Sequence, residues 1–395
     1  MDPIDGKPLL ARYDLAKAAI SLSRASLAKR RARGLWRWWE LLPVRAWENA
    51  LFLGEGATPL LDVPRLGSHY GVPKLRIKAD SLNPTGSFKA RGMAVAVSRA
   101  AELGVKRLVV PSAGNAGGAL SAYAAAAGIP TIVIMPADAP FANQVEVALT
   151  GAELILLDGL ISDCGRLARV LADELGAFDV STLKEPYRLE GKKTMGLELA
   201  EDLNWHLPDV VIYPTGGGTG LIGMWKGFDE LQSVGLIDSV RPRMFSVQPE
   251  GCAPIVRSFK SGERFATPWE GAATAAGGLR VPNVLGDFLI LDCLRASGGG
   301  AVAVPESDLV DTRQTIGRLT GLYLSLETSA AVAAVPNLLA EGRIGRDDSI
   351  VVFDTGSGFK SEPPTELPAA YSVGPDPRTW ESVIDRLIGR ESHDR

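Results

Sequence analysis

The feature that most constrains the fold is an alternation of short apolar runs with segments of helical character along most of the chain. Such alternation favours parallel β-sheets that are covered by helices. The predicted strands are 74–79, 107–111, 131–135, 153–157, 210–213, 243–247 and 350–353. The predicted helices between them are 86–103, 116–127, 142–149, 191–203 and 221–234. The expected fold class is therefore α/β.

The length of the chain, 395 residues, exceeds what one ordinary domain needs. We therefore predict two parallel-sheet lobes with a ligand site between them. Residues 1–55 are predicted to form an N-terminal helical extension, with helices within 12–33. Residues 56–85 and 190–395 are assigned to a larger lobe, and 86–189 to a smaller one. Beyond Ser361, Pro-rich loops lead to a predicted charged helix.

Composition and charge exclude several classes of function. A formal net charge of −4 argues against a nucleic-acid-binding protein, because such proteins need a basic surface. No apolar run is long enough for a membrane span, and no secretory signal is expected, so we predict a cytoplasmic protein. The basic run at 29–33 and the tryptophans at 36–39 are interpreted as a solvated helix face beside a docking patch, although nucleic-acid or membrane contact is the alternative.

Metal and thiol chemistry are not expected either. The three cysteines, Cys164, Cys252 and Cys293, lack the spacing of a zinc site or a disulfide framework. The three histidines stand apart from any carboxylate cluster. The sequence therefore predicts no metal site and no His-based triad.

The segment 83–92 places Lys89 one turn into a predicted helix that begins at a polar, glycine-containing turn. Burial and the positive potential of a helix N-terminus both lower the pKa of a lysine, which makes its amine a better nucleophile. A lysine in a helix is ordinarily a surface residue. The neighbouring loops favour the functional interpretation instead.

Two further loops follow predicted strands and precede predicted helices. In 111–118, backbone N–H groups and the Ser112 hydroxyl can hold an anion, and Asn115 can donate to a ring oxygen, although an ordinary N-cap is the alternative. In 214–220, consecutive glycines can close around a phosphate beside a helix N-terminus. That second loop also satisfies the dinucleotide spacing G-x-G-x-x-G, which is weak evidence because it leaves the lysine loop unexplained.

The fourth loop, 354–358, follows the predicted strand 350–353. A hydroxyl at the carboxyl end of a strand points into the cleft where open α/β sheets bind ligands. Thr355 could therefore hydrogen-bond a pyridine nitrogen without ionising it. Such a partner leaves the ring a weaker electron sink than a carboxylate would, which suits elimination or replacement more than transamination.

These four loops in this order resemble the fold type II pyridoxal-phosphate enzymes, which have the tryptophan synthase β-like fold, and within them the threonine synthases. The resemblance extends to 35–37, 40–43, 53–60, 190–194 and 278–282. It implies two lobes with pyridoxal 5'-phosphate between them, a small amino-acid substrate and a homodimer. The implied reaction converts O-phosphohomoserine and water to threonine and phosphate.

The resemblance also implies a role for each matching residue. Lys89 would be the Schiff-base lysine and the general acid/base, with Phe88 beside the cofactor ring. Asn115 would bond the phenolic oxygen, and Thr355 would meet the pyridine nitrogen. The loop that would hold the cofactor phosphate is Gly216, Gly217, Gly218, Thr219 and Gly220. The substrate carboxylate would be received by Thr85, Ser87, Ser112 and Gly114. Two cations, Lys184 and Arg188, could attract a substrate phosphate.

Three departures from the family pattern keep other functions open. Ala90 stands where members commonly carry Asp, 182–188 replaces a common Asn-Ser pair, and 326–330 lacks the more usual Gly-Ala pair. A serine/threonine dehydratase-like ammonia-lyase would tolerate the altered 182–188 segment, because it needs no second phosphate site. A cofactor-binding protein without turnover is the third hypothesis, which Lys89 and Thr355 do not favour.

Overall fold

The computed structural model describes residues 1–32, 34–360, 373–381, 383–385 and 387. Met1–Ser361 form one compact unit, and Glu362–Arg395 form a second. The charged helix predicted beyond Ser361 falls largely outside the described residues, and the part described contains a 3-10 helix at Pro377–Thr379.

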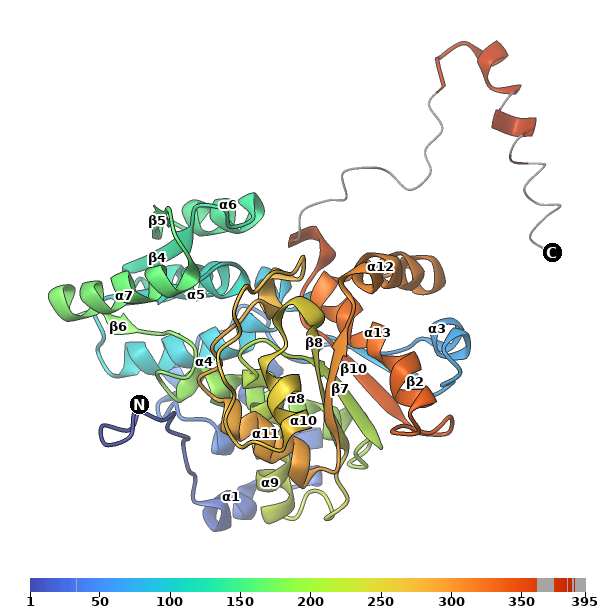
Figure 1. Ribbon diagram of the computed structural model, residues 1–395. Helices are drawn as coiled ribbons and strands as arrows, with labels where there is room; N and C mark the ends of the chain where they lie inside the picture. The colour runs from blue at the N-terminus through green and yellow to red at the C-terminus, as the bar shows by residue number, and fades with distance from the viewer. Residues whose placement is uncertain (33, 361–372, 382, 386, 388–395) are drawn as a thin grey trace. The chain divides into compact units, whose positions relative to one another are not determined.

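The larger sheet of the first unit has six strands (Figure 1). Their spatial order is β1-β2-β10-β7-β8-β9. All neighbours are parallel except β1 and β2, which pair antiparallel at the sheet edge. The strands are β1 (Leu60–Asp62), β2 (Leu75–Ala79), β7 (Val210–Pro214), β8 (Arg243–Pro249), β9 (Gly300–Val304) and β10 (Ile350–Asp354).

Alternate residues of these strands enter two apolar layers, as parallel sheets covered on both faces require. On β7, Val210 and Ile212 pack in the cluster that includes α13, whereas Val211 and Tyr213 pack in the cluster that includes α8 and α9. The helices around this sheet are α3 (Pro64–His69), α8 (Tyr187–Asp202), α9 (Thr219–Ser233), α10 (Pro254–Ser261), α11 (Asp287–Ala296), α12 (Glu306–Thr320) and α13 (Leu326–Ala340).

The smaller sheet has four parallel strands in the order β5-β4-β3-β6. Val109 and Ile132 pack against α7, whereas Leu108 and Val133 pack in the cluster that includes α4 and α5. Figure 1 shows these helices beside the sheet. The elements are β3 (Leu108–Pro111), β4 (Thr131–Pro136), β5 (Glu153–Leu157), β6 (Phe178–Asp179), α4 (Lys89–Glu102), α5 (Asn115–Ala127), α6 (Phe141–Leu149) and α7 (Ile161–Leu175).

The α/β class with parallel sheets is confirmed, and the sequence prediction lacks several elements. It omits the short edge strands β1 and β6 and also strand β9. The omitted helices are α3, α7 and α10 to α13. β6 has two residues, which is too short to show a period, and α13 is buried almost all round and contains Pro336, so it has no clear apolar stripe. The strands of the smaller sheet all lie within 86–189, but the lobe boundaries themselves stay a prediction.

The start of α4 differs from the prediction. The predicted helix begins at residue 86, but Thr85 and Gly86 have φ values of 64° and 63°, and Ser87 is extended. Left-handed residues cannot continue a right-handed helix. Lys89 is therefore the first residue of α4 and not a residue one turn inside it.

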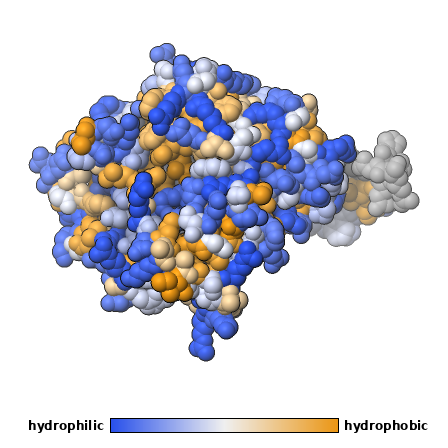
Figure 2. All heavy atoms as spheres, turned by 90° about the horizontal axis from the view of Figure 1, so that it is seen from below, coloured by the Kyte–Doolittle hydropathy of each residue, from blue (hydrophilic) through white to orange (hydrophobic). Residues whose placement is uncertain are grey.

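The N-terminal residues form α1 (Leu15–Ser21), α2 (Arg24–Lys29) and a 3-10 helix at Gly34–Leu41. Trp36 and Trp38 are buried in this last helix, and Arg30 pairs with Glu40. On the face drawn in Figure 2, hydrophobic residues gather in patches between hydrophilic ones. Among the described helices, none has the length and apolar character needed to cross a membrane.

Candidate functional site

A cavity of about 220 Å³ lies at the carboxyl ends of β7 and β10. Pro214 ends β7, Thr355 follows β10, and Asn115 begins α5 after β3. Side chains from both sheets' connections therefore meet at one site, as expected for open α/β sheets. The lining residues are Phe88, Lys89, Asn115, Thr182, Leu183, Arg188, Tyr213, Pro214, Gly216, Gly217, Gly218, Thr219, Gly278, Leu279, Val281, Asn283, Leu285, Glu327, Thr355 and Gly356.

The backbone ties the lysine loop directly to the loop after β10. The Phe88 N–H donates to the Thr355 carbonyl over 3.2 Å, and the Ser357 N–H donates to the Gly86 carbonyl over 2.9 Å. An isolated antiparallel bridge joins Ser87 to Gly356. These bonds fix Lys89 and Thr355 on the wall of the same cavity.

Lys89 is poised to act as a neutral amine near physiological pH. Burial first and the Arg188 charge second lower its pKa to about 7, against the Glu327 carboxylate, which acts in the opposite direction. The Lys89 Nζ atom lies 4.1 Å from the centroid of the Phe88 ring. An amine must lose its proton before it can attack an aldehyde, so this environment favours covalent chemistry.

The glycine loop forms a cradle that side chains would fill. A Cβ atom on Gly216 would lie 2.4 Å from the Gly278 carbonyl oxygen, and one on Gly218 would lie 2.2 Å from Ile290 Cδ1. Gly218 has φ +69° and precedes the first residue of α9. Backbone N–H groups at the start of this 15-residue helix are available for an anion. The loop therefore fits a phosphate group.

Several buried polar atoms near the cavity make no hydrogen bond within the described part of the chain. They include Asn115 Oδ1 and Tyr213 Oη on the cavity wall, and Thr85 Oγ1 and Ser87 Oγ beside it. Leaving a buried polar atom unsatisfied costs about 1–3 kcal/mol. A polar ligand in the cavity would supply partners for the first two.

Thr355 is held by a short chain of hydrogen bonds. Its N–H donates to Thr328 Oγ1 over 3.2 Å, and Thr328 Oγ1 donates to Asp354 Oδ1 over 2.8 Å. Burial raises the pKa of Asp354 to about 6, against hydrogen bonds that lower it. The group that lines the cavity is therefore a neutral hydroxyl rather than this carboxylate.

Six residues assigned from the sequence do not line the cavity: Thr85, Ser87, Ser112, Gly114, Lys184 and Gly220. Ser112 Oγ accepts from the Gly117 N–H over 2.9 Å, in the first turn of α5. The Lys184 ammonium pairs with Asp179 at 2.7 Å, so its predicted contact with a substrate phosphate stays a prediction. Gly220 packs against Tyr213, where a Cβ would lie 2.0 Å from the phenol oxygen.

The sequence interpretation gave no role to Glu327, Tyr213 and Asn283, which line the cavity. Glu327 Oε1 accepts from the Gly278 N–H over 2.8 Å, which ties the loop at 277–285 to the start of α13. The sequence feature that could have indicated a role for Glu327 is its position as a carboxylate at the start of an alanine-rich helix. Nothing local marks Tyr213, which reads as an ordinary strand residue.

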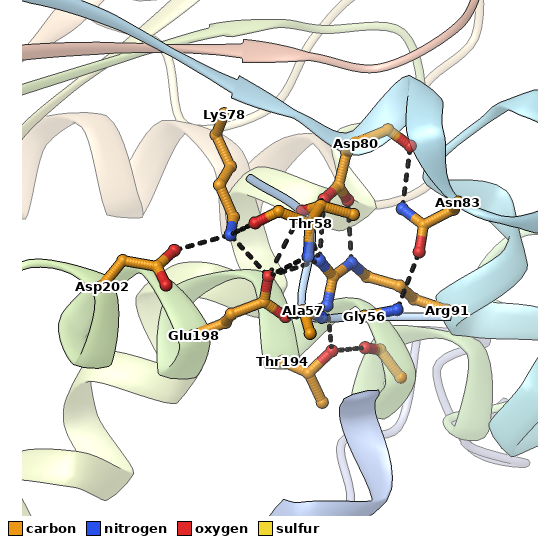
Figure 3. A network of polar contacts seen from close by, with 11 residues as sticks. Gly56, Ala57, Thr58, Lys78, Asp80, Asn83, Arg91, Thr194, Glu198 and Asp202 are labelled. Atoms are coloured by element: carbon orange, nitrogen blue, oxygen red, sulfur yellow. Dashed lines mark hydrogen bonds and ion pairs between the residues drawn. The ribbon is translucent and has the colours of Figure 1, made fainter. Parts of the chain in front are cut away.

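A buried network of charges holds the lysine-bearing helix against the larger sheet (Figure 3). Arg91 donates to both Asp80 and Glu198, at 2.7 and 2.8 Å. Lys78 pairs with the same Glu198 at 2.5 Å and with Asp202 at 2.6 Å. Figure 3 shows the Arg91 side chain between Asp80, which directly follows β2, and Glu198 on α8. The network therefore fixes the position of α4 and of Lys89 at its start.

The family model described as "pyridoxal-phosphate dependent enzyme" matches residues 51–356. The chain belongs to this family. It is 35% identical over 376 residues to a threonine synthase of Methanosarcina acetivorans, with 95% of this chain and 90% of the relative covered. A threonine synthase of Methanocaldococcus jannaschii is 36% identical, with 88% and 85% covered. These relatives confirm the resemblance to threonine synthases.

The solved structures agree on the fold. The processed form of threonine deaminase isoform 2 from Solanum lycopersicum aligns with a TM-score of 0.67 and 18% identity, covering 90% of each chain. At this identity the likeness shows the fold alone. The predicted fold type II architecture is thus confirmed, and pyridoxal phosphate is the family's cofactor.

Proposed function

We propose that this protein is a threonine synthase, which converts O-phosphohomoserine and water to threonine and phosphate. The observation that carries the proposal is the match to threonine synthases at 35–36% identity over most of both chains. The cavity supports it, because the Arg188 guanidinium, which is 2% exposed, lines the wall near Lys89. A fixed cation there is suited to a phosphate that the substrate carries.

The cofactor, when bound, supplies an aldehyde for covalent attachment and a ring that withdraws electrons from the substrate's α-carbon. In the proposed arrangement, Gly216, Gly217, Gly218, Thr219 and Gly220 hold the cofactor phosphate as the glycine cradle and helix end permit. The side chains around the cavity also fit the cofactor ring. Asn115 would bond its phenolic oxygen, Thr355 would meet its pyridine nitrogen, and Phe88 would lie beside it.

Lys89 has two tasks in this proposal. It holds the cofactor in the resting protein, and its freed amine then moves protons at the substrate's α and β carbons. Over the whole reaction, the bond from Cγ to the phosphate oxygen breaks and phosphate leaves. The oxygen of water bonds to Cβ, and Cγ becomes a methyl group. Arg188 orients the leaving phosphate.

A PLP-dependent ammonia-lyase is the second candidate. One observation favours it: Lys184, predicted to attract the substrate phosphate, is paired with Asp179 instead. Only Arg188 of the two predicted cations lines the cavity, and Leu183 contributes an apolar wall beside it. Serine or threonine needs no phosphate site, so this weaker cation set would suffice for them.

One assay separates the candidates. Purified protein with pyridoxal phosphate is incubated in parallel with O-phosphohomoserine, serine and threonine, and released phosphate and ammonia are measured. We expect stoichiometric phosphate and threonine from phosphohomoserine. Ammonia from serine or threonine without phosphate release would establish the lyase instead. Neither product from any of the three would point to a binding protein without turnover.

The low pKa of Lys89 predicts how cofactor attachment depends on pH. Above a pKa of about 7 the buried amine is neutral and reactive, and below it the amine is protonated and inert. The rate at which cofactor-free protein takes up pyridoxal phosphate should therefore rise with pH and level off above about 8, measured by stopped-flow absorbance. A rate that still rises tenfold per pH unit up to pH 10 would contradict the low pKa of Lys89.

Three finer assignments also remain proposals. Thr85, Ser87, Ser112 and Gly114 are proposed to receive the substrate carboxylate, which requires them to approach the cavity when substrate is bound. The homodimer is proposed from the family resemblance, and light scattering of the purified protein tests it. A cytoplasmic location likewise stays a proposal.

A further inference from the structure

Lys192 is a buried lysine that no carboxylate neutralises. It is 1% exposed, and its amine makes no hydrogen bond or ion pair with any residue in the described ranges. The other buried lysines on the larger sheet and on α8 differ: Lys78 pairs with Glu198 and Asp202, and Lys193 pairs with Glu190 and Glu230. Because burying an unpaired charge is costly, the Lys192 amine requires a separate explanation.

Lys192 lies directly behind the cavity wall. It stands four residues after Arg188 on α8, so the two side chains share one face of the helix. Its Nζ atom lies 5.2 Å from the centroid of the Phe88 ring, the ring that also contacts Lys89. A Cβ on Gly92 would lie 3.3 Å from Lys192 Nζ, so the missing side chain of Gly92 leaves the room that this amine occupies.

The charges that face Lys192 are mostly of its own sign. Arg188 on α8, and Lys89 on α4 when it is protonated, oppose protonation of Lys192, and Glu185 in the preceding loop is the acid that favours it. The Glu185 oxygens are already engaged by the Tyr187 and Arg188 backbone N–H groups. Burial and these cations lower the pKa of Lys192 well below its ordinary value. Burial and the neighbouring cations therefore disfavour a proton on this amine while the cavity holds no anion.

We propose that Lys192 is a positioning residue that takes up a proton when an anionic group of the substrate binds beside Arg188, so that the anion meets two positive charges. An anion at Arg188 offsets the repulsion that opposes protonation of Lys192 and supplies the attraction that the amine lacks. Protonation of Lys192 in turn strengthens anion binding, because linkage between the two events is reciprocal. The inference deepens the proposed function and rests on its placement of the substrate phosphate.

Binding of sulfate to the cofactor-loaded protein tests the proposal. Sulfate keeps a fixed charge across the pH range used, and the bound cofactor fills the glycine cradle. Calorimetry at pH 7.5 in buffers of different ionisation enthalpy gives the number of protons taken up. We expect about one proton per sulfate in the wild type, in line with proton linkage at a single group. No uptake, or no sulfate binding, would overturn the proposal.

Three variants assign the proton. Lys192→Met, which is close in volume, should take up no proton and bind sulfate about tenfold more weakly, the loss of about 1.4 kcal/mol of attraction. Lys192→Arg, which is always charged, should retain affinity without uptake. Arg188→Met should lose the site, which locates the ion. Unchanged affinity and uptake in Lys192→Met would refute the role of Lys192.

The test is independent of turnover. If phosphohomoserine is not converted but sulfate binding is still linked to one proton at Lys192, the proposed reaction is wrong and the proposed role of Lys192 in anion binding is supported. If phosphohomoserine is converted but sulfate binding takes up no proton, the proposed role of Lys192 is wrong and the proposed reaction is supported. In the second case, the KM for phosphohomoserine in Lys192→Met should match that of the wild type.

Discussion

Replacing Lys89 by alanine is expected to abolish covalent cofactor binding and to lower turnover by at least about 10³-fold, since both attachment and proton transfer use this amine. Lys89 is the lysine that lines the cavity, among the residues that the structure describes. Its low pKa, caused first by burial and then by Arg188, suits both roles. The measurements are phosphate release from phosphohomoserine and the absorbance of the protein after removal of free pyridoxal phosphate.

A matched control is available in the same segment. Lys106→Ala removes an exposed lysine after α4 and should change neither absorbance nor turnover. Borohydride treatment of the wild type followed by peptide mapping should find the cofactor on the peptide that contains Lys89. A Lys89→Ala protein that kept full turnover, or a label found on Lys192, would contradict the assignment.

The site residues that could be predicted from the sequence are those whose role is indicated by the short segment around each of them. Lys89, Asn115, Gly216 and Thr355 each follow a strand pattern or a glycine turn, and all four line the same cavity. Because parallel strands present their carboxyl ends at one edge, loops after successive strands converge without further information. The four-loop prediction therefore required no knowledge of distant contacts.

The rest depends on contacts between segments far apart in the chain. Glu327 reaches the cavity because its helix starts beside Gly278, and Lys192 reaches Phe88 because α4 and α8 cross closely at Gly92 and Gly191. A Cβ on Gly191 would lie 2.0 Å from the Arg91 carbonyl oxygen. No periodicity within α8 distinguishes Lys192, which faces the site, from Lys193, which is paired elsewhere.

The same limit explains the boundary of α4 and the role of Lys184. Whether a glycine turn ends before or after a helix start depends on backbone angles, here the left-handed Thr85 and Gly86, that composition does not specify. Lys184 is predicted to attract a phosphate from its position near Arg188, and the sequence gives no sign that its ammonium pairs with Asp179. Nearest ion-pair partners are decided by the folded structure.

The network around Arg91 should carry the largest effect on stability. Glu198 accepts from Arg91, Lys78 and the N–H groups of Ala57 and Thr58, and it is 5% exposed. Glu198→Gln keeps the shape but leaves two buried cations without their shared counter-ion. Breaking one partner of a buried ion pair typically costs about 3–5 kcal/mol, and we expect a loss of that size in the free energy of unfolding.

The effect should depend on pH in a defined direction. Burial alone would raise the pKa of Glu198, but the charges and hydrogen bonds of Arg91 and Lys78 outweigh burial and hold the pKa well below its ordinary value of 4.5. Protons therefore bind this carboxylate more tightly in the unfolded chain. Its stabilisation is fully present above pH 4.5 and is lost as the pH falls toward the lower pKa of the folded protein.

Urea unfolding of the wild type and Glu198→Gln at several pH values from 7 downward measures the loss in the free energy of unfolding and the direction of its pH dependence. The difference between the two proteins should be constant from pH 7 to 5.5 and should narrow below about 4.5, where the wild type begins to lose the carboxylate's contribution. Asp292→Asn, which removes one partner of the exposed pair with Arg264, serves as control and should cost no more than about 1 kcal/mol. A cost for Glu198→Gln as small as the control's would mean that the network does not hold α4, because neutralising an essential buried counter-ion cannot be free of cost.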